Sequence, residues 1–361
     1  MVEAVIISIT LFAALTVVFS VAIRKIGDKK NDRINPDEKN ISIIIAARNE
    51  EENLDNLFLS LEQQNYPKDK FEIVFVDDNS TDETFAVAQK YTDRFIHFRL
   101  LKAEHKNLPA KKGALEIGIA EAQFPFLLFT DADCMPESNW LKAFSNKFAT
   151  NFDLLLGFAP LTFQKTFANH FFCFENFRTT ILSFTVAKLG MPYSAASRSL
   201  GITKEAFRKL GGFSKTLQTL GGDDDLLIRE AVKSKCKIGI VSEAESLVFS
   251  NTAKNFAGYF MQKRRHTATS FHYLWQHQLL LGFWHLLNIL AVDSLFLIPF
   301  LPEAGYLFLS KIFCDYFIIY SFQKRFKYKF SFGEIFFFQI LYECFLVVHF
   351  FNTKFFKIKW K

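Results

Sequence analysis

Cysteine is sparse in this sequence of 361 residues, and the few cysteines are scattered. No two of them form a Cys-x-x-Cys pair, and none stands at a histidine spacing typical of a zinc site. The common zinc motifs are therefore excluded, and free thiols in a reducing compartment are expected. The cysteines are Cys134, Cys173, Cys236, Cys314 and Cys344.

A long basic tract is missing as well. The formal net charge is +6, and the basic residues stand beside apolar runs and near the C-terminus. A nucleic-acid partner is therefore not expected. Apolar residues, in contrast, are abundant, since 50% of the sequence is hydrophobic and 46 residues are Phe. One soluble core does not require so many, and part of this apolar surface is expected to face membrane lipid.

Residues 4–23 are uncharged and mostly apolar, and as a helix they are long enough to cross a bilayer. A cleaved signal peptide is the competing interpretation, but its basic residues would precede the apolar run, whereas here they follow it. We therefore predict an anchor over residues 1–24, with the N-terminus outward and the chain beyond it in the cytosol. The basic residues after the run are Arg24, Lys25, Lys29, Lys30 and Arg33.

Between residues 41 and 252 short β-rich runs alternate with longer amphipathic stretches, a pattern typical of a parallel sheet covered by helices. A soluble α/β domain over residues 40–272 is predicted. We expect strands over 41–46, 72–76 and 126–130, and helices over 50–64 and 82–91. The third of these strands delivers Asp131 to its carboxyl end, the edge at which open α/β sheets bind ligands.

A second apolar region is predicted over residues 278–352, followed by a basic tail over 353–361. Two apolar runs, 279–300 and 306–322, are separated by a short turn and indicate a helical hairpin. The basic loop that follows fits a return to the cytosol. A last apolar run, 330–351, would leave the basic tail on the outer side if it crossed, so spanning, re-entrant and interfacial placements stay open. The basic residues concerned are Lys324, Arg325, Lys327 and Lys329 in the loop, and Lys354, Lys357, Lys359 and Lys361 in the tail.

Four charged residues fall inside these apolar runs: Asp293, Lys311, Asp315 and Glu343. Charges in lipid are costly, so all four are expected to face the interior of the helix bundle. Lys311 and Asp315 stand four residues apart on a helix and can neutralise each other.

The first two strands end in acidic segments, Ala47-Arg-Asn-Glu50 and Val76-Asp-Asp-Asn-Ser-Thr-Asp82. Carboxylates at such strand ends can accept hydrogen bonds from a nucleobase or from ribose hydroxyls. The alternative for the second segment is a plain turn and helix cap, which the same residue types favour equally.

The third strand ends in Thr130-Asp-Ala-Asp-Cys134. Alternation along an extended chain directs Asp131 and Asp133 to the same side. Mg²⁺ and Mn²⁺ prefer oxygen ligands and are commonly shared with substrate phosphates, so one or two carboxylates are enough. A capped turn before Pro136 is the simpler alternative.

Taken with Gly221-Gly-Asp-Asp-Asp-Leu226, these segments resemble family 2 glycosyltransferases of the GT-A fold, in the order that the family shows. The resemblance covers about residues 40–270. It implies a Rossmann-like mixed sheet flanked by helices, with one N-terminal and two to three C-terminal transmembrane helices as in the integral-membrane members. It also implies that Asp77 or Asp78 contacts the nucleoside, that Asp131 lies near the ribose and phosphates, and that Asp133 binds Mg²⁺ or Mn²⁺. The nucleotide-sugar site would further include Ala47, Arg48 and Glu50, although Arg48 could instead pair with Asp78 or Glu50.

Three further segments resemble family motifs. Lys111 stands where the family's Lys-x-x-Ala-Leu pattern has a phosphate-side lysine, although a solvated lysine is as plausible. The cluster Asp223, Asp224 and Asp225 resembles the motif that supplies the general base, and two alignments favour Asp223 or Asp224; we favour Asp224, because repulsion raises a carboxyl pKa. The same charges would also complement a helix N-terminus.

Gln262-Lys-Arg-Arg-His266 resembles the Gln-x-x-Arg-Trp motif of processive members, with His266 in place of Trp. Gln262 and Arg265 share one helical face and could stabilise a diphosphate, or could meet anionic lipid. The Phe-rich stretch 163–189 could lie on the membrane beside the site, but a helix packed against the sheet is the simpler interpretation.

The sequence thus predicts a hexosyltransferase-type enzyme of the inner cell membrane with a cytosolic catalytic domain. As the resemblance implies, it would transfer a sugar, with inversion, from a UDP- or GDP-sugar to a lipid-linked or glycan acceptor, as in cell-envelope polysaccharide synthesis. Two alternatives stay open. A nucleotidyltransferase would release pyrophosphate instead of a nucleoside diphosphate, and a membrane scaffold that keeps a nucleotide-binding fold would release neither.

Overall fold

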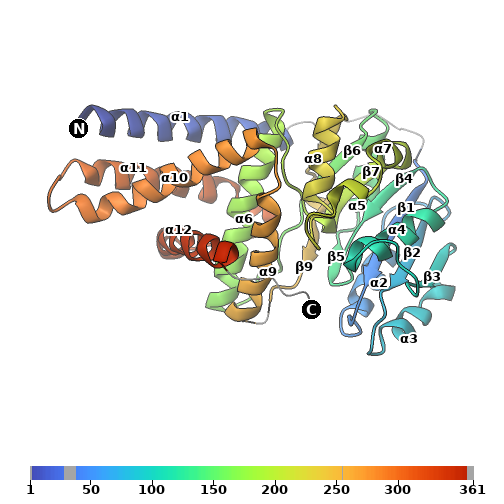
Figure 1. Cartoon of the computed structure of the whole chain (residues 1–361). Coiled ribbons are helices and arrows are strands. Elements are labelled where there is room, and N and C mark those ends of the chain that lie inside the picture. The colour runs from blue at the N-terminus through green and yellow to red at the C-terminus, as the bar shows by residue number, and fades with distance from the viewer. Residues whose placement is uncertain (1, 28–37, 254, 356–361) are drawn as a thin grey trace.

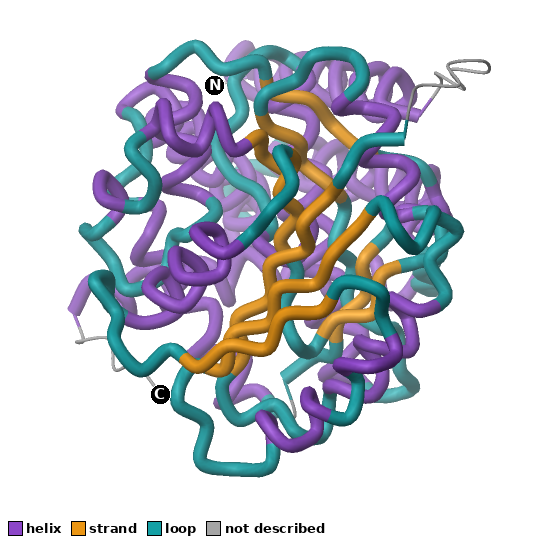
Figure 2. Tube along the Cα trace, turned by 90° about the vertical axis from the view of Figure 1, so that its right-hand side faces the viewer, coloured by secondary structure: helices purple, strands orange, loops and turns teal. Residues whose placement is uncertain are grey.

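A seven-stranded mixed sheet forms the centre of the soluble part of the protein, in the order β3-β2-β1-β4-β7-β6-β8 (Figure 2). The computed structural model describes residues 2–27, 38–253 and 255–355. Strand β7 runs antiparallel to its neighbours β4 and β6, and the other neighbouring strands are parallel, so the expected mixed sheet is confirmed. The strands are β1 Ile41–Ala47, β2 Phe71–Asp77, β3 Phe98–Lys102, β4 Phe126–Phe129, β6 Leu154–Gly157, β7 Leu200–Thr203 and β8 Ile238–Val241.

The central strands are buried on both faces, which explains their continuous apolar sequences. In β1, Ile43 and Ile45 pack into one hydrophobic core, and Ile44 packs into the other. Residues of the first core come from α2 Leu54–Glu62, α3 Thr84–Gln89 and α5 Trp140–Phe148. The second core includes residues of α4 Ala110–Glu121, α7 Lys204–Leu210 and α8 Asp225–Lys233.

The expected strands match the observed ones to within a residue or two, but the first two helices are shorter than predicted. Helix α2 begins at Leu54 and α3 at Thr84, because the residues before them form turns. Polar side chains in these turns bond to backbone N–H groups of the neighbouring loop, and such bonds compete with helix formation.

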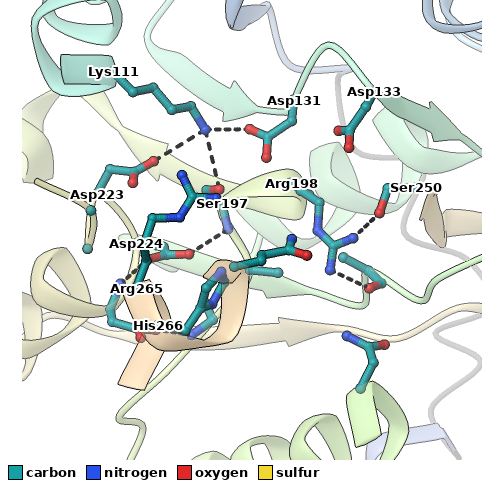
Figure 3. Close-up of a pocket in the computed structure, with 18 of the residues that line it drawn as sticks. Lys111, Asp131, Asp133, Ser197, Arg198, Asp223, Asp224, Ser250, Arg265 and His266 are labelled. Atoms are coloured by element: carbon teal, nitrogen blue, oxygen red, sulfur yellow. Dashed lines mark hydrogen bonds and ion pairs between the residues drawn. The ribbon is translucent and has the colours of Figure 1, made fainter. Parts of the chain in front are cut away.

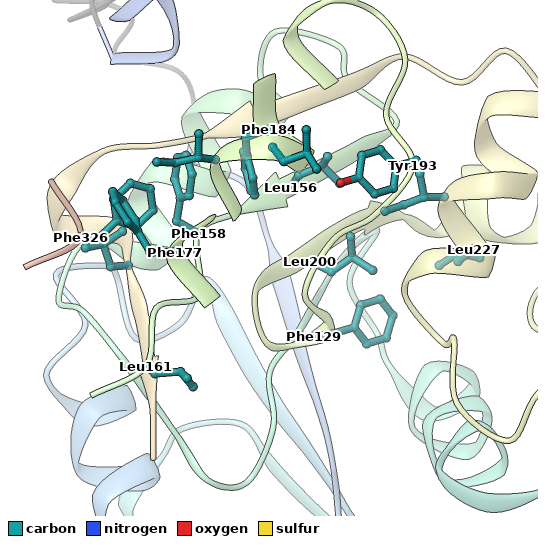
Figure 4. Close-up of a cluster of buried hydrophobic side chains, with 14 of the residues drawn as sticks. Phe129, Leu156, Phe158, Leu161, Phe177, Phe184, Tyr193, Leu200, Leu227 and Phe326 are labelled. Carbon is teal, nitrogen blue, oxygen red and sulfur yellow. The ribbon is translucent and has the colours of Figure 1, made fainter. Parts of the chain in front are cut away.

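The second core joins the sheet to helix α6, Phe167–Lys188 (Figure 4). Phe158, which follows β6, stacks on Phe184 with 4.0 Å between the ring centroids. Phe177 lies 4.9 Å from Phe326 in the same cluster. The Phe-rich stretch is therefore a helix packed against the sheet.

Helices α6 and α9, Phe256–Ser270, stand between the sheet and a group of long apolar helices (Figure 1). A short two-stranded sheet, β5 Cys134–Pro136 with β9 Val248–Ser250, lies at the edge of the soluble part. The apolar group contains α1 Val2–Gly27, α10 Trp275–Leu297, α11 Ala304–Phe322 and α12 Phe332–Phe355.

Three helices of the described chain are long and apolar enough to cross a membrane: α1 over Ile6–Lys25, α10 over Trp275–Leu297 and α12 over Phe332–Phe355. One of these candidates lies at the N-terminus and two lie in the C-terminal region, whereas the predicted run 306–322, which corresponds to α11, is not among them. Helix α11 forms the predicted hairpin with α10 and also packs against α1. Of the predicted basic segments, Lys29, Lys30, Arg33 and residues 356–361 lie outside the described residues.

Four buried charged side chains connect α6 to this group. Arg178 of α6 donates to Asp315 of α11 at 2.6 Å and lies 3.4 Å from a carboxylate oxygen of Glu343 in α12. Lys311 pairs with Asp315 at 2.5 Å, as predicted, and lies 3.5 Å from Glu343. Two positive and two negative groups offset one another, which lowers the cost of burying them.

The prediction that all the charged residues of the apolar runs face the interior is wrong for one of them. Lys311, Asp315 and Glu343 are buried, but the side chain of Asp293 is exposed on α10. Asp293 stands near the C-terminal end of its helix, where a charged group can reach the polar edge of a bilayer at lower cost.

Candidate active site

A cavity of about 620 Å³ opens at the carboxyl ends of β1 and β4 and extends to α6 and α9 (Figure 3). Every site residue predicted from the sequence lines this cavity, with the exception of Asp77. Segments distant in sequence therefore meet at one place. The predicted residues that line it are Ala47, Arg48, Glu50, Asp78, Lys111, Asp131, Asp133, Asp223, Asp224, Asp225, Gln262 and Arg265.

The loops that follow β1 and β2 are held to each other by side-chain hydrogen bonds. Asn49 accepts a hydrogen bond from the backbone N–H of Thr81 at 2.8 Å, and its own N–H donates to Ser80 at 3.0 Å. Thr84 accepts from the N–H of Glu50 at 2.8 Å. Many polar residues of the Asp-Asn-Ser-Thr-Asp segment thus build the turn, as the simpler interpretation had it, and this turn shapes one rim of the cavity.

Asp77 and Asp78 have different surroundings. The side chain of Asp77 is buried beneath the loop, where it accepts a hydrogen bond from the N–H of Ser80 at 3.4 Å. Asp78 faces the cavity and pairs with Lys106 at 2.5 Å. Of the two candidates for a nucleoside contact, the structure brings only Asp78 to the cavity surface.

Lys111 connects two acidic segments across the cavity (Figure 3). Its ammonium group pairs with Asp131 at the end of β4 and lies 3.4 Å from a carboxylate oxygen of Asp223. These negative charges hold the pKa of Lys111 well above its usual value, although burial opposes the shift. The adjacent Lys112 points elsewhere, and donates to the backbone carbonyls of Thr216 and Thr219. Lys111 is therefore a cavity lysine and Lys112 a structural one.

Asp131 and Asp133 both line the cavity, as predicted, but not through alternation along an extended chain, because β4 ends at Phe129 and residues 131–134 form a turn closed by a hydrogen bond from the N–H of Cys134 to the carbonyl of Asp131 at 3.2 Å. Burial and the neighbouring charge of Asp131 raise the pKa of Asp133, and the charges of Arg198 and Lys111 compensate its ionised form only in part. In the described residues no group of three His, Cys, Asp or Glu side chains could hold a metal ion. One or two carboxylates fit a hard divalent cation that takes its remaining ligands from substrate phosphates and water.

The three acidic residues before α8 differ in their partners. Asp225 accepts a hydrogen bond from the N–H of Ala195 at 3.1 Å and another from the Tyr273 hydroxyl. Asp224 accepts from the N–H of Ser197 at 3.0 Å and caps the helix through the N–H of Asp225 at 2.7 Å. Burial, followed by the charges of Asp225 and Asp223, raises the pKa of Asp224 well above the usual carboxyl range.

Arg198 is a cavity residue that sequence reasoning missed. It donates to the hydroxyl of Ser250 and to the carbonyl of Ala159 at 3.1 Å, and its charge partly offsets that of Asp133. Arg198 belongs to the segment 194–198, which lines the cavity beside the acidic residues. No motif marks this segment, because only the pairing of β7 with β4 brings it to the site.

Helix α9 supplies Gln262, Arg265 and His266 to the cavity. Burial lowers the pKa of Arg265, while the charge of Asp223 acts in the opposite direction. The surrounding protein and the charges of Lys263 and Arg265 lower the pKa of His266 to about 3, so its ring is neutral at pH 7. The segment thus faces the site, as its resemblance to the Gln-x-x-Arg-Trp motif indicated.

Comparison with known proteins agrees with these findings. Residues 42–198 match the family model described as Glycosyl transferase family 2. This part of the chain is therefore similar to glycosyl transferase family 2. Among the similar proteins is glycosyltransferase AglE of Haloferax volcanii, which is 27% identical over 186 residues, 51% of this chain and 58% of AglE. Poly(ribitol-phosphate) beta-N-acetylglucosaminyltransferase TarS of Staphylococcus aureus is 33% identical over 93 residues, 26% of this chain and 16% of TarS.

The chain also resembles a solved structure over nearly its whole length. Mannosyltransferase PcManGT from Pyrobaculum calidifontis, in complex with GDP-Man and Mn²⁺, has a TM-score of 0.57 at 14% sequence identity. The likeness covers 98% of this chain and 99% of that one, and it confirms the GT-A fold. The matched part of the chain spans only 58% of the length of AglE and 16% of the length of TarS. The similarity therefore does not extend over the whole of either relative.

Substitution of Gly222 tests how the backbone conformation before Asp223, Asp224 and Asp225 is maintained. Gly222 has a φ of 74°, and a Cβ there would lie 2.9 Å from side-chain atoms of both Leu226 and Thr269. We expect Gly222→Ala to lower the free energy of unfolding by roughly 1–3 kcal/mol, because the left-handed backbone and the crowding both penalise a side chain. Thermal unfolding of the detergent-solubilised protein would measure this.

Gly221→Ala is the matched control, since a Cβ at Gly221 meets nothing within 4 Å. This control is expected to change stability by at most about 0.5 kcal/mol. Equal effects of the two substitutions would contradict the role assigned to Gly222.

Proposed function

We propose that the protein is a membrane-bound glycosyltransferase that moves a sugar from a nucleotide-diphosphate sugar to a lipid-linked or glycan acceptor. The observation that supports this proposal is one cavity with two opposite sides. Lys111 of α4 and the carboxylates after β4, Asp131 and Asp133, lie on one side, and the acidic segment before α8 lies on the other. Sugar transfer needs both halves of such a site. One half stabilises a leaving diphosphate, and the other accepts a proton from the acceptor.

The donor half is formed by the ends of β1, β2 and β4. Asp78 and Arg48 would flank the nucleoside of a UDP- or GDP-sugar, and Lys111 would donate to its diphosphate. Asp133, with Asp131, would hold Mg²⁺ or Mn²⁺, and the bound ion would offset the negative charge of the leaving group. Gln262 and Arg265 of α9 face the same cavity and would support the diphosphate from the other side.

Asp224 is the proposed general base. Asp223 lies beside Lys111 on the phosphate side. Asp224 and Asp225 each accept a hydrogen bond on both oxygens, but one partner of Asp225 is the Tyr273 hydroxyl, whereas both partners of Asp224 are backbone N–H groups. Asp224 is fixed by two backbone N–H groups, and its raised pKa makes its ionised carboxylate a stronger proton acceptor. One base without a second carboxylate acting as nucleophile is what a single displacement needs, so inversion at the sugar is expected.

Replacement of Asp133 and Asp224 tests the assignment. With a donor found by screening nucleotide sugars for release of nucleoside diphosphate, Asp133→Asn should lose metal-stimulated release, by roughly a thousandfold, because several kcal/mol of charge stabilisation disappear. Asp224→Asn should lower transfer to the acceptor by roughly a hundredfold to ten-thousandfold, because no base remains.

Asp153→Asn is the control, since Asp153 only accepts a backbone hydrogen bond from Lys237 and does not line the cavity. Metal-dependent transfer that survives in Asp133→Asn would sink the assignment of the metal ligand. Release of pyrophosphate in place of nucleoside diphosphate would show a nucleotidyltransferase instead.

The coupled carboxylates also predict a pH dependence. A general base works only when ionised, so activity falls as the pH drops through its pKa, which here lies above the ordinary carboxyl range. The charge of Asp225, whose own pKa is raised to about 6, contributes to that shift. Asp225→Asn removes this charge and should move the acid limb of kcat/KM to lower pH.

Asp55→Asn is a matched control, because Asp55 also accepts a hydrogen bond from a tyrosine hydroxyl, that of Tyr91, but lies outside the cavity. It should leave the acid limb in place. An unchanged or raised limb in Asp225→Asn would rule out an Asp224 base coupled to Asp225.

We propose that the catalytic domain faces the cytosol of the cell and that α12 lies along the membrane interface. Arg24 and Lys25 stand at the end of α1 nearest the sheet, which fits retention of basic residues in the cytosol (Figure 1). Helix α12 packs along α9, which lines the cavity: His349 stacks edge-on against Phe260 at 4.8 Å. An interfacial α12 keeps Lys354 on the cytosolic side.

Reporter fusions test this topology. Green fluorescent protein fused after residue 361 should fluoresce, and alkaline phosphatase at the same place should be inactive, because the C-terminus would be cytosolic. Fusions after residue 302, in the turn between α10 and α11, serve as the control and should give the opposite pattern. Active phosphatase after residue 361 would mean that α12 crosses the membrane.

A further inference from the structure

The middle of α6 is buried except at three positions. Of residues 171–186, all side chains are buried except those of Asn176, Thr179 and Thr180. All three line the cavity, and so does Ser183, which is 5% exposed. Residues spaced by three and four share one face of a helix. We name these four residues the polar row.

The polar row has hydrogen-bonding capacity that the protein leaves unused. The structure gives the Thr180 hydroxyl and the Asn176 amide N–H₂ group no partner within the part of the chain that it describes. Asn176 accepts only a long hydrogen bond, 3.5 Å, from the Tyr328 hydroxyl. Thr179 donates to Glu175 at 3.2 Å and also has a side-chain hydrogen bond with Tyr342, so the unused capacity belongs to Thr180 and Asn176. A ligand with both donors and acceptors would satisfy this surface.

The chemistry of the row is uncharged. The basic side chains nearest to it have other partners: Lys263 pairs with Glu175, and Arg178, on the opposite face of α6, pairs with Asp315 at 2.6 Å. Arg198 donates to Ser250 and Ala159. The hydroxyl and amide groups of the row suit a ligand that carries hydroxyl groups better than a phosphate, which binds most strongly to cationic side chains.

The position of α6 points to where such a ligand comes from. One face of the helix lines the cavity, while Arg178 of the same helix contacts the buried carboxylates of α11 and α12. At its two ends Phe167 and Leu189 are 56% and 54% exposed. Exposed apolar residues beside the membrane helices suit contact with lipid. A molecule anchored in that lipid would meet the cavity at α6.

We propose that the polar row is the acceptor subsite, and that it recognises the uncharged, hydroxyl-bearing headgroup of a membrane-embedded amphiphile. The inference rests on the proposed glycosyl transfer and narrows its acceptor from any lipid-linked or glycan molecule to this class. The headgroup hydroxyl to be glycosylated would lie in the same cavity as Asp224, which takes its proton as the bond from that oxygen to the sugar carbon forms and the bond to the nucleoside diphosphate breaks.

The test uses the full chain in lipid nanodiscs and two kinds of acceptor probe: a panel of octyl glycosides, which are uncharged, and farnesyl phosphate, which is anionic. The wild-type protein should transfer sugar to at least one octyl glycoside. Thr180→Val and Asn176→Ala should each raise the KM for that glycoside about tenfold, the effect of losing one well-placed hydrogen bond. The KM for the donor should change by less than twofold.

Thr185→Val is the matched control on the same helix, because Thr185 is fully buried and does not line the cavity. It should leave the KM for the glycoside unchanged. Preference for farnesyl phosphate, transfer to neither probe despite release of nucleoside diphosphate, or equal KM values in Thr180→Val and Thr185→Val would overturn the subsite. Absence of nucleoside diphosphate release from the wild-type protein with every donor would instead refute the proposed function, and the subsite with it.

Discussion

The geometry of the site depends on one cation, the ammonium group of Lys111, placed between carboxylates that would otherwise repel one another. It contacts Asp131 at the end of β4 and Asp223 before α8, two segments that no continuous element connects. The cavity brings seven carboxylates together, and a central positive charge lowers the free energy of their assembly. These are Glu50, Asp78, Asp131, Asp133, Asp223, Asp224 and Asp225. A diphosphate and its metal would enter a site already organised around the same kind of charge pairing.

Reasoning from the sequence succeeded where the functional residues lie directly at the end of a predicted strand. The acidic strand ends could be predicted because strand polarity determines the edge of the sheet at which Asp131 lies. Asp133 reaches the same cavity through the turn of residues 131–134, which alternation along a strand does not describe. Sequence reasoning did less well where tertiary packing decides. Asp77 and Asp78 are adjacent in sequence, yet only Asp78 reaches the cavity, because the turn that follows β2 covers Asp77. Arg198 had no local signal, since its place follows from the antiparallel pairing of β7.

Helix α6 both connects the soluble domain to the apolar helices and lines the cavity. Its Phe residues pack against the sheet and against α12, and Arg178 joins buried carboxylates of two bundle helices. A buried pair of this kind is expensive to break, because a lone charge would remain without water. The sequence indicated the apolar content of α6. It did not indicate that the polar positions of this helix face the site, because the side of the helix on which the sheet lies is known only from the structure.

The cavity consequently has two chemical halves. The half built from the sheet edge carries the paired charges around Lys111, while the half built from α6 offers hydroxyl and amide groups. His266, neutral because its pKa is about 3, adds no charge at the place where the related motif has Trp. The phosphates of a donor would therefore bind in the charged half, and an uncharged acceptor would bind in the half with hydroxyl and amide groups, because each ligand is better solvated there. Asp224 is the residue before α8, and its proposed role as base follows from its place in the cavity that both halves share.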